Sequence, residues 1–267
     1  MLRSLFTAIS GLGAHQQMLD VTANNIANVN TTGFKSSAAV FEDTLSQTLQ
    51  GGGAAAGGNG GTDPIQVGLG VKLAGTGLNF TQGSAQATGI PSNMMINGDG
   101  FFMVQKNGQQ LYTRAGAFTL DGSGQLVTPD GAVAEDVTGT PMDLSALNSG
   151  TYVSWSIDNN GNVNAVDNTG TTTSLGQIGL ATFANPNGLH KNGDTTYIAS
   201  PNSGTPNIGA ANSGPRGDIS AGYVEMSNVD LSKELTNLII AQRGFQANSK
   251  VITTSDEILQ TLVSLKN

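Results

Sequence analysis

Two histidines, His15 and His190, are the only imidazole groups that could serve as acid, base or metal ligand, and the chain has no cysteine. Neither histidine belongs to the His-Glu-x-x-His pattern that puts two zinc ligands on one helix face. The absence of cysteine excludes disulfides, thiolate metal sites and a cysteine nucleophile. No Gly-x-Ser-x-Gly elbow is present. We therefore expect both histidines to be surface residues without a catalytic role.

The glycine and carboxylate patterns also fall short of known sites. Two segments, 68–70 and 98–100, begin like a Gly-x-Gly-x-x-Gly nucleotide loop, but Leu73 and Met103 stand where the third glycine belongs. The segment that starts at Asp158 resembles a calcium loop, but Thr169 occupies the position of the bidentate glutamate. The sequence thus contains no catalytic or metal-binding constellation. We expect a protein that is not an enzyme and needs no cofactor.

Composition limits the partners of the chain. Its 267 residues carry 11 Lys and Arg against 19 Asp and Glu, which gives a formal net charge of -8. Nucleic-acid binding requires clustered cations, so no nucleic-acid partner is expected. No run of about 18 apolar residues occurs, so no membrane insertion is expected. Arg3 and the short apolar stretch after it resemble a signal peptide. No cleavage site follows the stretch, so we do not expect a cleaved signal peptide.

Both ends of the chain show the 3-4 apolar spacing of a coiled-coil helix. The spacing predicts one helix from about residue 3 to residue 29 and another from about 229 to 264, the latter opening with a capping box at Ser227 and Asp230. The two helices can pair with each other within the chain or with helices of other copies, and spacing alone leaves both possibilities open. The apolar positions of the expected stripes that we assign to an assembly interface are Leu5, Ile9, Leu12, Leu19, Ile26, Leu231, Leu235, Leu238, Phe245, Ile252 and Leu259.

Between the helices the pattern is β. Turn pairs of the Asn-Gly and Asp-Gly type, which favour hairpins, separate short stretches of alternating residues. A Gly-rich segment, 51–61, can bury almost nothing and is expected to be a flexible insert. The fold class is therefore α+β, with terminal helices that form a coiled coil and bracket an all-β domain. The expected boundaries are 1–30 and 226–267 for the helical domain, 31–65 for a connecting segment, and 66–225 for the β domain.

At this point the residues resemble a known family. The segments that carry the resemblance are 23–35 (ANNIANVNTTGFK), 67–71 (VGLGV), 98–104 (GDGFFMV), 112–118 (YTRAGAF), 222–230 (GYVEMSNVD) and 240–250 (IAQRGFQANSK). They are similar to the bacterial flagellar rod and hook proteins over most of the chain. The resemblance implies a non-enzymatic subunit, exported by the flagellar type III apparatus, that polymerises into a helical tube. It also implies that the terminal helices line the inside of the tube and the β domain faces outward.

Two members of that family are compatible with these motifs. Segments 238–250 and 68–72 look more like a hook protein, which favours a subunit of the flexible joint that passes motor torque from rod to filament. The alternative is a distal rod protein, because the insert at about 49–63 lies where such proteins carry a stiffening insertion. A secreted β-rich adhesin or enzyme is the alternative from another class. The hook interpretation implies an extracellular position in the flagellum after export, with other copies, distal rod, hook-cap and hook–filament junction proteins as partners.

Three asparagines complete the expected interface. Asn24, Asn25 and Asn28 lie where the first helix should end. Asparagine side chains satisfy free backbone groups near helix ends, so we expect this cluster to terminate the helix and to form hydrogen bonds with neighbouring segments or copies.

Overall fold

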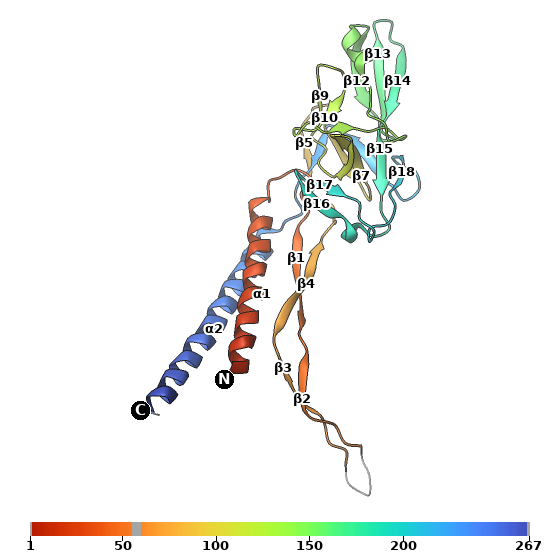
Figure 1. Cartoon of the computed structure of the whole chain (residues 1–267). Helices are drawn as coiled ribbons and strands as arrows, with labels where there is room; N and C mark the ends of the chain where they lie inside the picture. The colour runs from red at the N-terminus through yellow and green to blue at the C-terminus, as the bar shows by residue number, and fades with distance from the viewer. Residues whose placement is uncertain (1, 55–59, 266–267) are drawn as a thin grey trace. The chain divides into compact units, whose positions relative to one another are not determined.

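The computed structural model describes residues 2–54 and 60–265 and divides the chain into two compact units. Unit 1 comprises residues 1–27, 37–78 and 230–267, and unit 2 comprises residues 28–36 and 79–229. The structure therefore contains terminal helices and a β-rich middle, which confirms the α+β class (Figure 1). The division falls at different points from the expected boundaries, because residues 37–78 group with the helices rather than with a connecting segment or the β domain.

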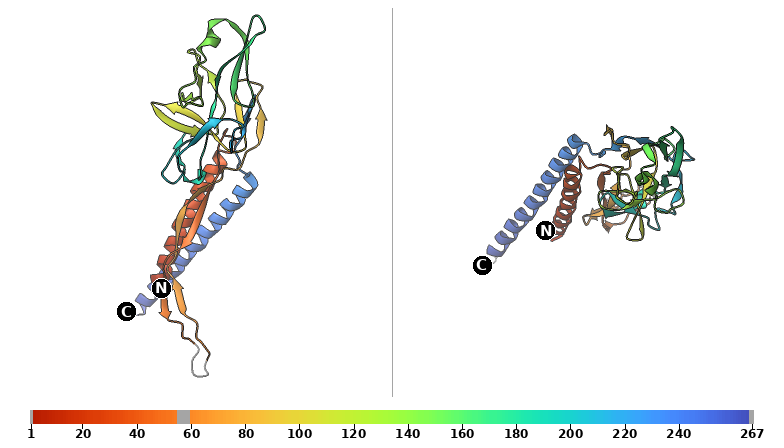
Figure 2. Two further views of the ribbon diagram at one scale, coloured as in Figure 1. Left: turned by 90° about the vertical axis from the view of Figure 1, so that its right-hand side faces the viewer. Right: turned by 90° about the horizontal axis from the view of Figure 1, so that it is seen from above.

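Unit 1 consists of two helices and a long two-stranded ladder. Its elements are α1 (Leu2–Ala27), β1 (Ser37–Asp43), β2 (Ser46–Gln50), β3 (Ile65–Gly68), β4 (Val71–Leu78) and α2 (Leu231–Ser264). The helices lie side by side in both views of Figure 2. They run antiparallel, because Gly11 meets Asn248 whereas the later residue His15 meets the earlier residue Gly244.

The ends of both helices lie within two residues of the expected positions, but the cap of α2 differs. Asp230 is the N-cap, and its side chain accepts hydrogen bonds from the backbone N–H groups of Ser232 and Lys233. Ser227 was expected to open the helix; it lies outside it and accepts a hydrogen bond from the backbone N–H of Val229 instead. An aspartate is the better cap here, because its charge also suits the positive end of the helix dipole.

The segments on either side of the Gly-rich insert form paired strands. Strand β1 pairs with β4, and β2 pairs with β3, so one antiparallel ladder runs outward from residue 37 (Figure 1). Beyond β2 and β3, Gly53 and Thr62 exchange two backbone hydrogen bonds of 2.9 and 3.0 Å. Within the described part of segment 51–61, Gly53 alone makes such a bridge, and residues 51, 52, 54, 60 and 61 have no regular structure; residues 55–59 lie outside the described residues. The flexible insert stays a prediction.

Unit 2 is built from short antiparallel strands around one core. A nine-stranded sheet has the order β16-β17-β8-β7-β11-β10-β9, with β15 pairing β7 and β18; β12, β13 and β14 form a second sheet; β6 pairs β19, and β5 pairs β20. The core residues include Ile96, Phe102, Phe118, Leu180 and Ile219. The bounds are β5 (Ala85–Ala87), β6 (Met94–Asn97), β7 (Phe101–Lys106), β8 (Gln109–Thr113), β9 (Thr119–Leu120), β10 (Leu126–Val127), β11 (Val133–Ala134), η1 (Ser145–Ser149), β12 (Tyr152–Ile157), β13 (Asn162–Asp167), β14 (Thr172–Gln177), β15 (Gly179–Thr182), η2 (Pro186–Gly188), β16 (His190–Gly193), β17 (Thr196–Ile198), β18 (Asn207–Ala210), β19 (Asp218–Ala221) and β20 (Tyr223–Glu225).

Most of the expected hairpin turns occur where their dipeptides stand. Asn107 and Gly108 adopt φ values of 53° and 78°, as a tight turn between β7 and β8 requires. Two of the Asn-Gly dipeptides do not connect the strands of a hairpin. Asn97 and Gly98 follow β6, which pairs with the distant β19, and Gly188 ends the short helix η2.

Candidate assembly site

The surface between α1 and α2 consists of small and polar side chains. The residues buried there or against the neighbouring ladder are Ala8, Ala14, Thr22 and Asn25 of α1 and Glu234, Ala241 and Ser255 of α2. A Cβ built at Gly11 would come within 2.8 Å of the Asn248 amide, and one at Gly244 would overlap the His15 ring. The two helices therefore approach closely because their facing residues are small.

The expected apolar interface residues are less buried than this set. On α2 the buried Glu234 directly precedes the expected Leu235, and the buried Ala241 and Ser255 each follow an expected residue, Leu238 and Ile252, by three positions. Three of the expected residues are exposed: Ile9 by 54%, Leu231 by 43% and Leu235 by 51%. The others are half-buried: Leu5, Leu12, Leu19, Ile26, Leu238, Phe245, Ile252 and Leu259. Large apolar side chains thus remain partly in water along both helices.

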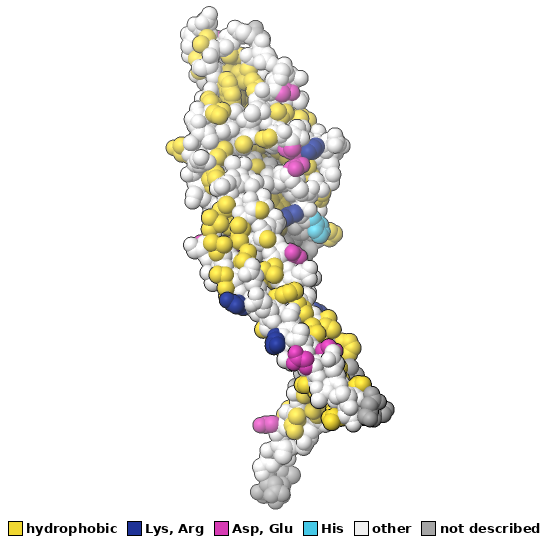
Figure 3. All heavy atoms as spheres, turned by 90° about the vertical axis from the view of Figure 1, so that its left-hand side faces the viewer, with side chains coloured by type: hydrophobic (Ala, Val, Ile, Leu, Met, Phe, Trp, Pro, Cys, Tyr) yellow, Lys and Arg dark blue, Asp and Glu magenta, His cyan; other side chains and the backbone are white. Residues whose placement is uncertain are grey.

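Further apolar residues on the helices, absent from the expected set, are also exposed. On α2 they include Ile239, Ile240, Ile258 and Leu262, each about half exposed, and on α1 Phe6 is 67% exposed. On the face drawn in Figure 3, hydrophobic side chains reach the surface and charged ones are few. Exposed apolar residues at this density are typical of an interaction surface. A search for a second apolar stripe beside the first would have found them.

The outer ladder of unit 1 has one apolar face. Its exposed apolar residues are Leu45, Leu49, Ile65, Val67 and Leu69. Side chains alternate between the two faces of a strand, and Gln47 pairs with Val67 while Thr48 pairs with Gln66. The apolar side chains of these strands therefore gather on one face together with Gln47, whereas Ser46, Thr48 and Gln66 lie on the other. This face was not among the sequence-based expectations, although the alternation of Ile65, Val67 and Leu69 indicates it.

The asparagine cluster at the end of α1 binds within the chain. The Asn25 side chain is 1% exposed; its Nδ2 donates to the Ser37 carbonyl at 2.7 Å, and its Oδ1 accepts from the Ser37 N–H at 3.0 Å. Asn25 thus joins the last turn of α1 to the first residue of β1. The Asn28 Oδ1 accepts from the Thr31 hydroxyl at 3.1 Å. Asn24 is exposed.

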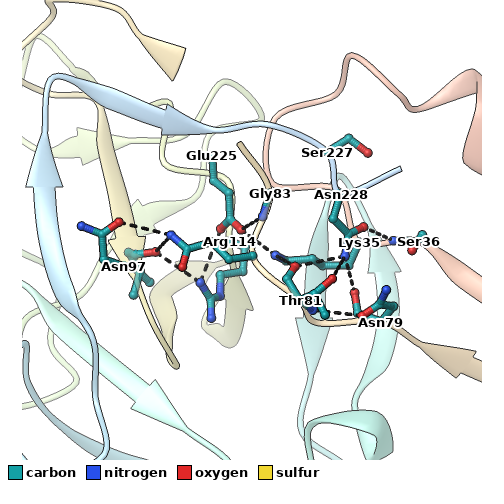
Figure 4. A network of polar contacts seen from close by, with 12 residues as sticks. Lys35, Ser36, Asn79, Thr81, Gly83, Asn97, Arg114, Glu225, Ser227 and Asn228 are labelled. Atoms are coloured by element: carbon teal, nitrogen blue, oxygen red, sulfur yellow. Dashed lines mark hydrogen bonds and ion pairs between the residues drawn. The ribbon is translucent and has the colours of Figure 1, made fainter. Parts of the chain in front are cut away.

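A buried ionic network lies in unit 2 (Figure 4). The Lys35 Nζ lies 2.6 Å from Glu225 Oε1, and the Arg114 Nη1 lies 3.4 Å from Glu225 Oε2. The side chains of Lys35 and Glu225 are 0% exposed and that of Arg114 is 3% exposed. Burial lowers the pKa of Lys35 and of Arg114, although the Glu225 carboxylate opposes both shifts. Such a network is costly to assemble and damaging to break.

No arrangement of catalytic groups appears among residues 2–54 and 60–265. His190 is exposed as expected, but the expectation of a surface position is wrong for His15, which is half-buried against Gly244 with its Nδ1 unpaired. In those ranges no three metal-ligating side chains come together, and neither helix is long and apolar enough to span a bilayer. A cavity of about 530 Å³ in unit 2 is lined by Phe80, Phe101 and Arg114 among others, and this guanidinium is already bound to Glu225.

Comparisons with known proteins agree on one family. The family model "Flagella basal body rod protein" matches residues 5–35, "Flagellar hook protein FlgE/F/G D1 domain" matches 95–165, and "Flagellar basal body rod FlgEFG protein C-terminal" matches 220–265. The flagellar basal-body rod protein FlgG of Bacillus subtilis is 48% identical over 269 residues, with all of both chains covered. In Borreliella burgdorferi, the rod protein FlgG is 38% identical, over the whole of this chain and 99% of its own length, and the hook protein FlgE is 28% identical over 442 residues, with all of both chains covered.

Proposed function

This chain belongs to the bacterial flagellar rod and hook family, and from that membership we propose that it is the distal rod subunit of the flagellar basal body. Members of the family are structural proteins of the flagellum, so the expectation that the chain is not an enzyme is confirmed. The proposed subunit polymerises into a straight, stiff tube that carries torque outward.

The observation that carries the proposal is the pair of relatives from one organism. Against the Borreliella rod protein the alignment spans 272 residues, close to the 267 of this chain, at 38% identity. Against the hook protein it spans 442 residues at 28% identity. The chain thus has the length and the higher similarity of a rod protein. This comparison favours the alternative named above over the hook interpretation, which rested on segments 238–250 and 68–72.

The ladder of unit 1 gives the proposal a physical basis. A pliable joint needs neighbours that slide, whereas a stiff tube needs contacts that resist sliding. The exposed apolar face of Leu45, Leu49, Ile65, Val67 and Leu69 would be buried against neighbouring subunits. Burying one such side chain fully contributes about 1.5–3 kcal/mol. Together with the exposed helix residues, this face would add contacts between copies that hold the wall straight. The partners that we propose for this chain are therefore other copies of it and the adjoining flagellar subunits.

The absence of cysteine makes a direct test possible. We would replace Asn160, an exposed residue between β12 and β13, by cysteine, label isolated basal structures with maleimide-gold, and image them by electron microscopy. The unmodified chain is the control for background labelling. Ser123→Cys, in the exposed turn between β9 and β10, is a second site in case neighbours cover the first. Gold on the straight shaft inside the envelope supports the proposal, and gold along the curved segment outside it overturns the proposal in favour of the hook.

A further inference from the structure

Two segments from opposite ends of the chain hold each other in unit 2. The Gly33 N–H donates to the Glu225 carbonyl at 2.7 Å, and the Ser36 N–H donates to Asn228 Oδ1 at 2.9 Å. The Asn228 Nδ2 in turn donates to the Asn79 carbonyl at 2.8 Å. Residues 33–36 and 225–228 are therefore bound to one another and to the start of the β body.

The C-terminal segment also completes the core. Strand β19 pairs with β6 over four residues and β20 pairs with β5 over three. Strand β6 contributes the buried residues Met94 and Ile96 to the core, and β19 contributes Ile219, each no more than 1% exposed. Without residues 218–225, the backbone groups of β6 would lose their ladder and Ile96 would lose a core neighbour.

The buried network joins two positive side chains, Lys35 and Arg114, to one negative side chain, Glu225. Among the residues that the structure describes, Glu225 is the only carboxylate that forms an ion pair with Lys35 and Arg114, and Asp99, which also acts on Arg114, is exposed. The Glu225 Oε1 additionally accepts from the Gly83 N–H at 2.8 Å. Removing the Glu225 charge would leave two buried cations without a counter-ion. Removing the Lys35 charge would leave a balanced pair, so the two losses are not equivalent.

We infer that the Glu225 carboxylate is the closing element of unit 2, so that this unit reaches a stable fold only when the segments from both ends of the chain are seated together. Opening of either segment then unfolds the β body instead of releasing a loose end. A pull on the ends is thereby opposed by the whole unit. The inference goes beyond the proposed function and does not depend on it, because it concerns how one chain closes.

The test uses the full chain and its single tryptophan. Trp155 packs against the core of unit 2, so its fluorescence during urea unfolding reports on that unit. We expect Glu225→Gln to raise the unfolding equilibrium constant by at least about a hundredfold, since breaking a buried pair has effects of that size. The matched control is Asp194→Asn, because Asp194 lies in the same unit, 3.5 Å from Lys106, and its side chain is 65% exposed. It should change the constant about fivefold or less.

Charge balance and cooperativity supply two further readouts. Lys35→Met should cost less than Glu225→Gln, and adding Lys35→Met to the Glu225→Gln chain should restore part of its stability, even if the single variant barely folds. Amide exchange in Glu225→Gln should accelerate together in β6, β19 and the central pair β7–β8.

Each readout can also overturn the inference. An unchanged Trp155 transition in Glu225→Gln would do so, as would a double variant no more stable than the single one. Rapid exchange confined to β19 and β20 would do the same, because the C-terminal segment would then open while the rest of unit 2 stayed folded.

Discussion

Leu235→Asp tests whether the exposed helix residues serve assembly. Leu235 is 51% exposed in the single chain, so replacing it there loses little burial. In a tube, the remaining half would be covered by a neighbour and would contribute about 1 kcal/mol. A carboxylate at the same place would have to leave water without a partner, at a cost of several kcal/mol. We therefore expect a folded chain that does not polymerise.

The expected change in the assembly concentration follows from those two free-energy contributions. Together they reach about 4 kcal/mol, and each 1.4 kcal/mol changes an equilibrium tenfold, so the concentration needed for assembly should rise about a thousandfold. Sedimentation and negative-stain microscopy measure that concentration, and Trp155 fluorescence checks that unit 2 remains folded. Thr236→Asp is the matched control, since it puts the same charge on the exposed polar neighbour.

The reasoning fails if Leu235→Asp forms normal tubes at the usual concentration, or if Thr236→Asp blocks assembly equally well. The first result would mean that Leu235 stays in water in the tube. The second would mean that added negative charge, and not the loss of an apolar contact, prevents assembly.

A related expectation is that both helices are weakly protected from amide exchange in the dilute monomer, because their shared seam buries mainly small residues. Strong protection there would contradict it.

Three more predictions concern unit 2 and can be read from Trp155 fluorescence. Thr195 has a φ of 56°, which is strained for a β-branched residue, so Thr195→Gly should raise the free energy of unfolding by about 1 kcal/mol; a loss would refute the strain. Burial raises the pKa of Glu135 although Gln110 donates a hydrogen bond to it, so its stabilising contribution is present below the usual carboxyl pKa and is lost as the pH rises. Glu135→Gln should therefore be more stable than the native chain at pH 7, and the difference should vanish near pH 4. A Cβ at Gly116 would overlap the Met94 carbonyl whereas one at Gly122 meets nothing within 4 Å, so Gly116→Ala should lose about 3 kcal/mol or more and Gly122→Ala almost none.

The local signals in the sequence were strong where one short segment decides the outcome. The 3-4 apolar spacing placed both helices within two residues of their ends. Asn107-Gly108 produced the expected hairpin because only those two residues need positive φ values. Similarity of motifs at both ends identified the family, but not the member, because segment 238–250 lies in the C-terminal region covered by one model for rod and hook proteins alike.

The sequence pattern did not predict which residues of each helix face the other helix. Large apolar residues and small residues form adjacent stripes with one period, and hydrophobicity ranks leucine above alanine and glycine. The structure puts Ala241 and Gly244 against α1 and leaves Leu235 outside. Close approach of the two backbones decides this choice, and only the pairing of the helices reveals it.

The chain by itself determined the type and limits of its helices, most of its turns and its family, since each depends on residues close in sequence or on motif identity. The tertiary structure decided what depends on distant partners. The strands on either side of the Gly-rich insert pair because β2 and β3, 15 positions apart or more, meet in the fold. Lys35 and Glu225 look like ordinary charged residues until the fold brings them, 190 positions apart, to 2.6 Å in a site without water contact. Burial makes the stability of the fold depend on that pair, because a charge removed from water is stabilised only by the partner it retains.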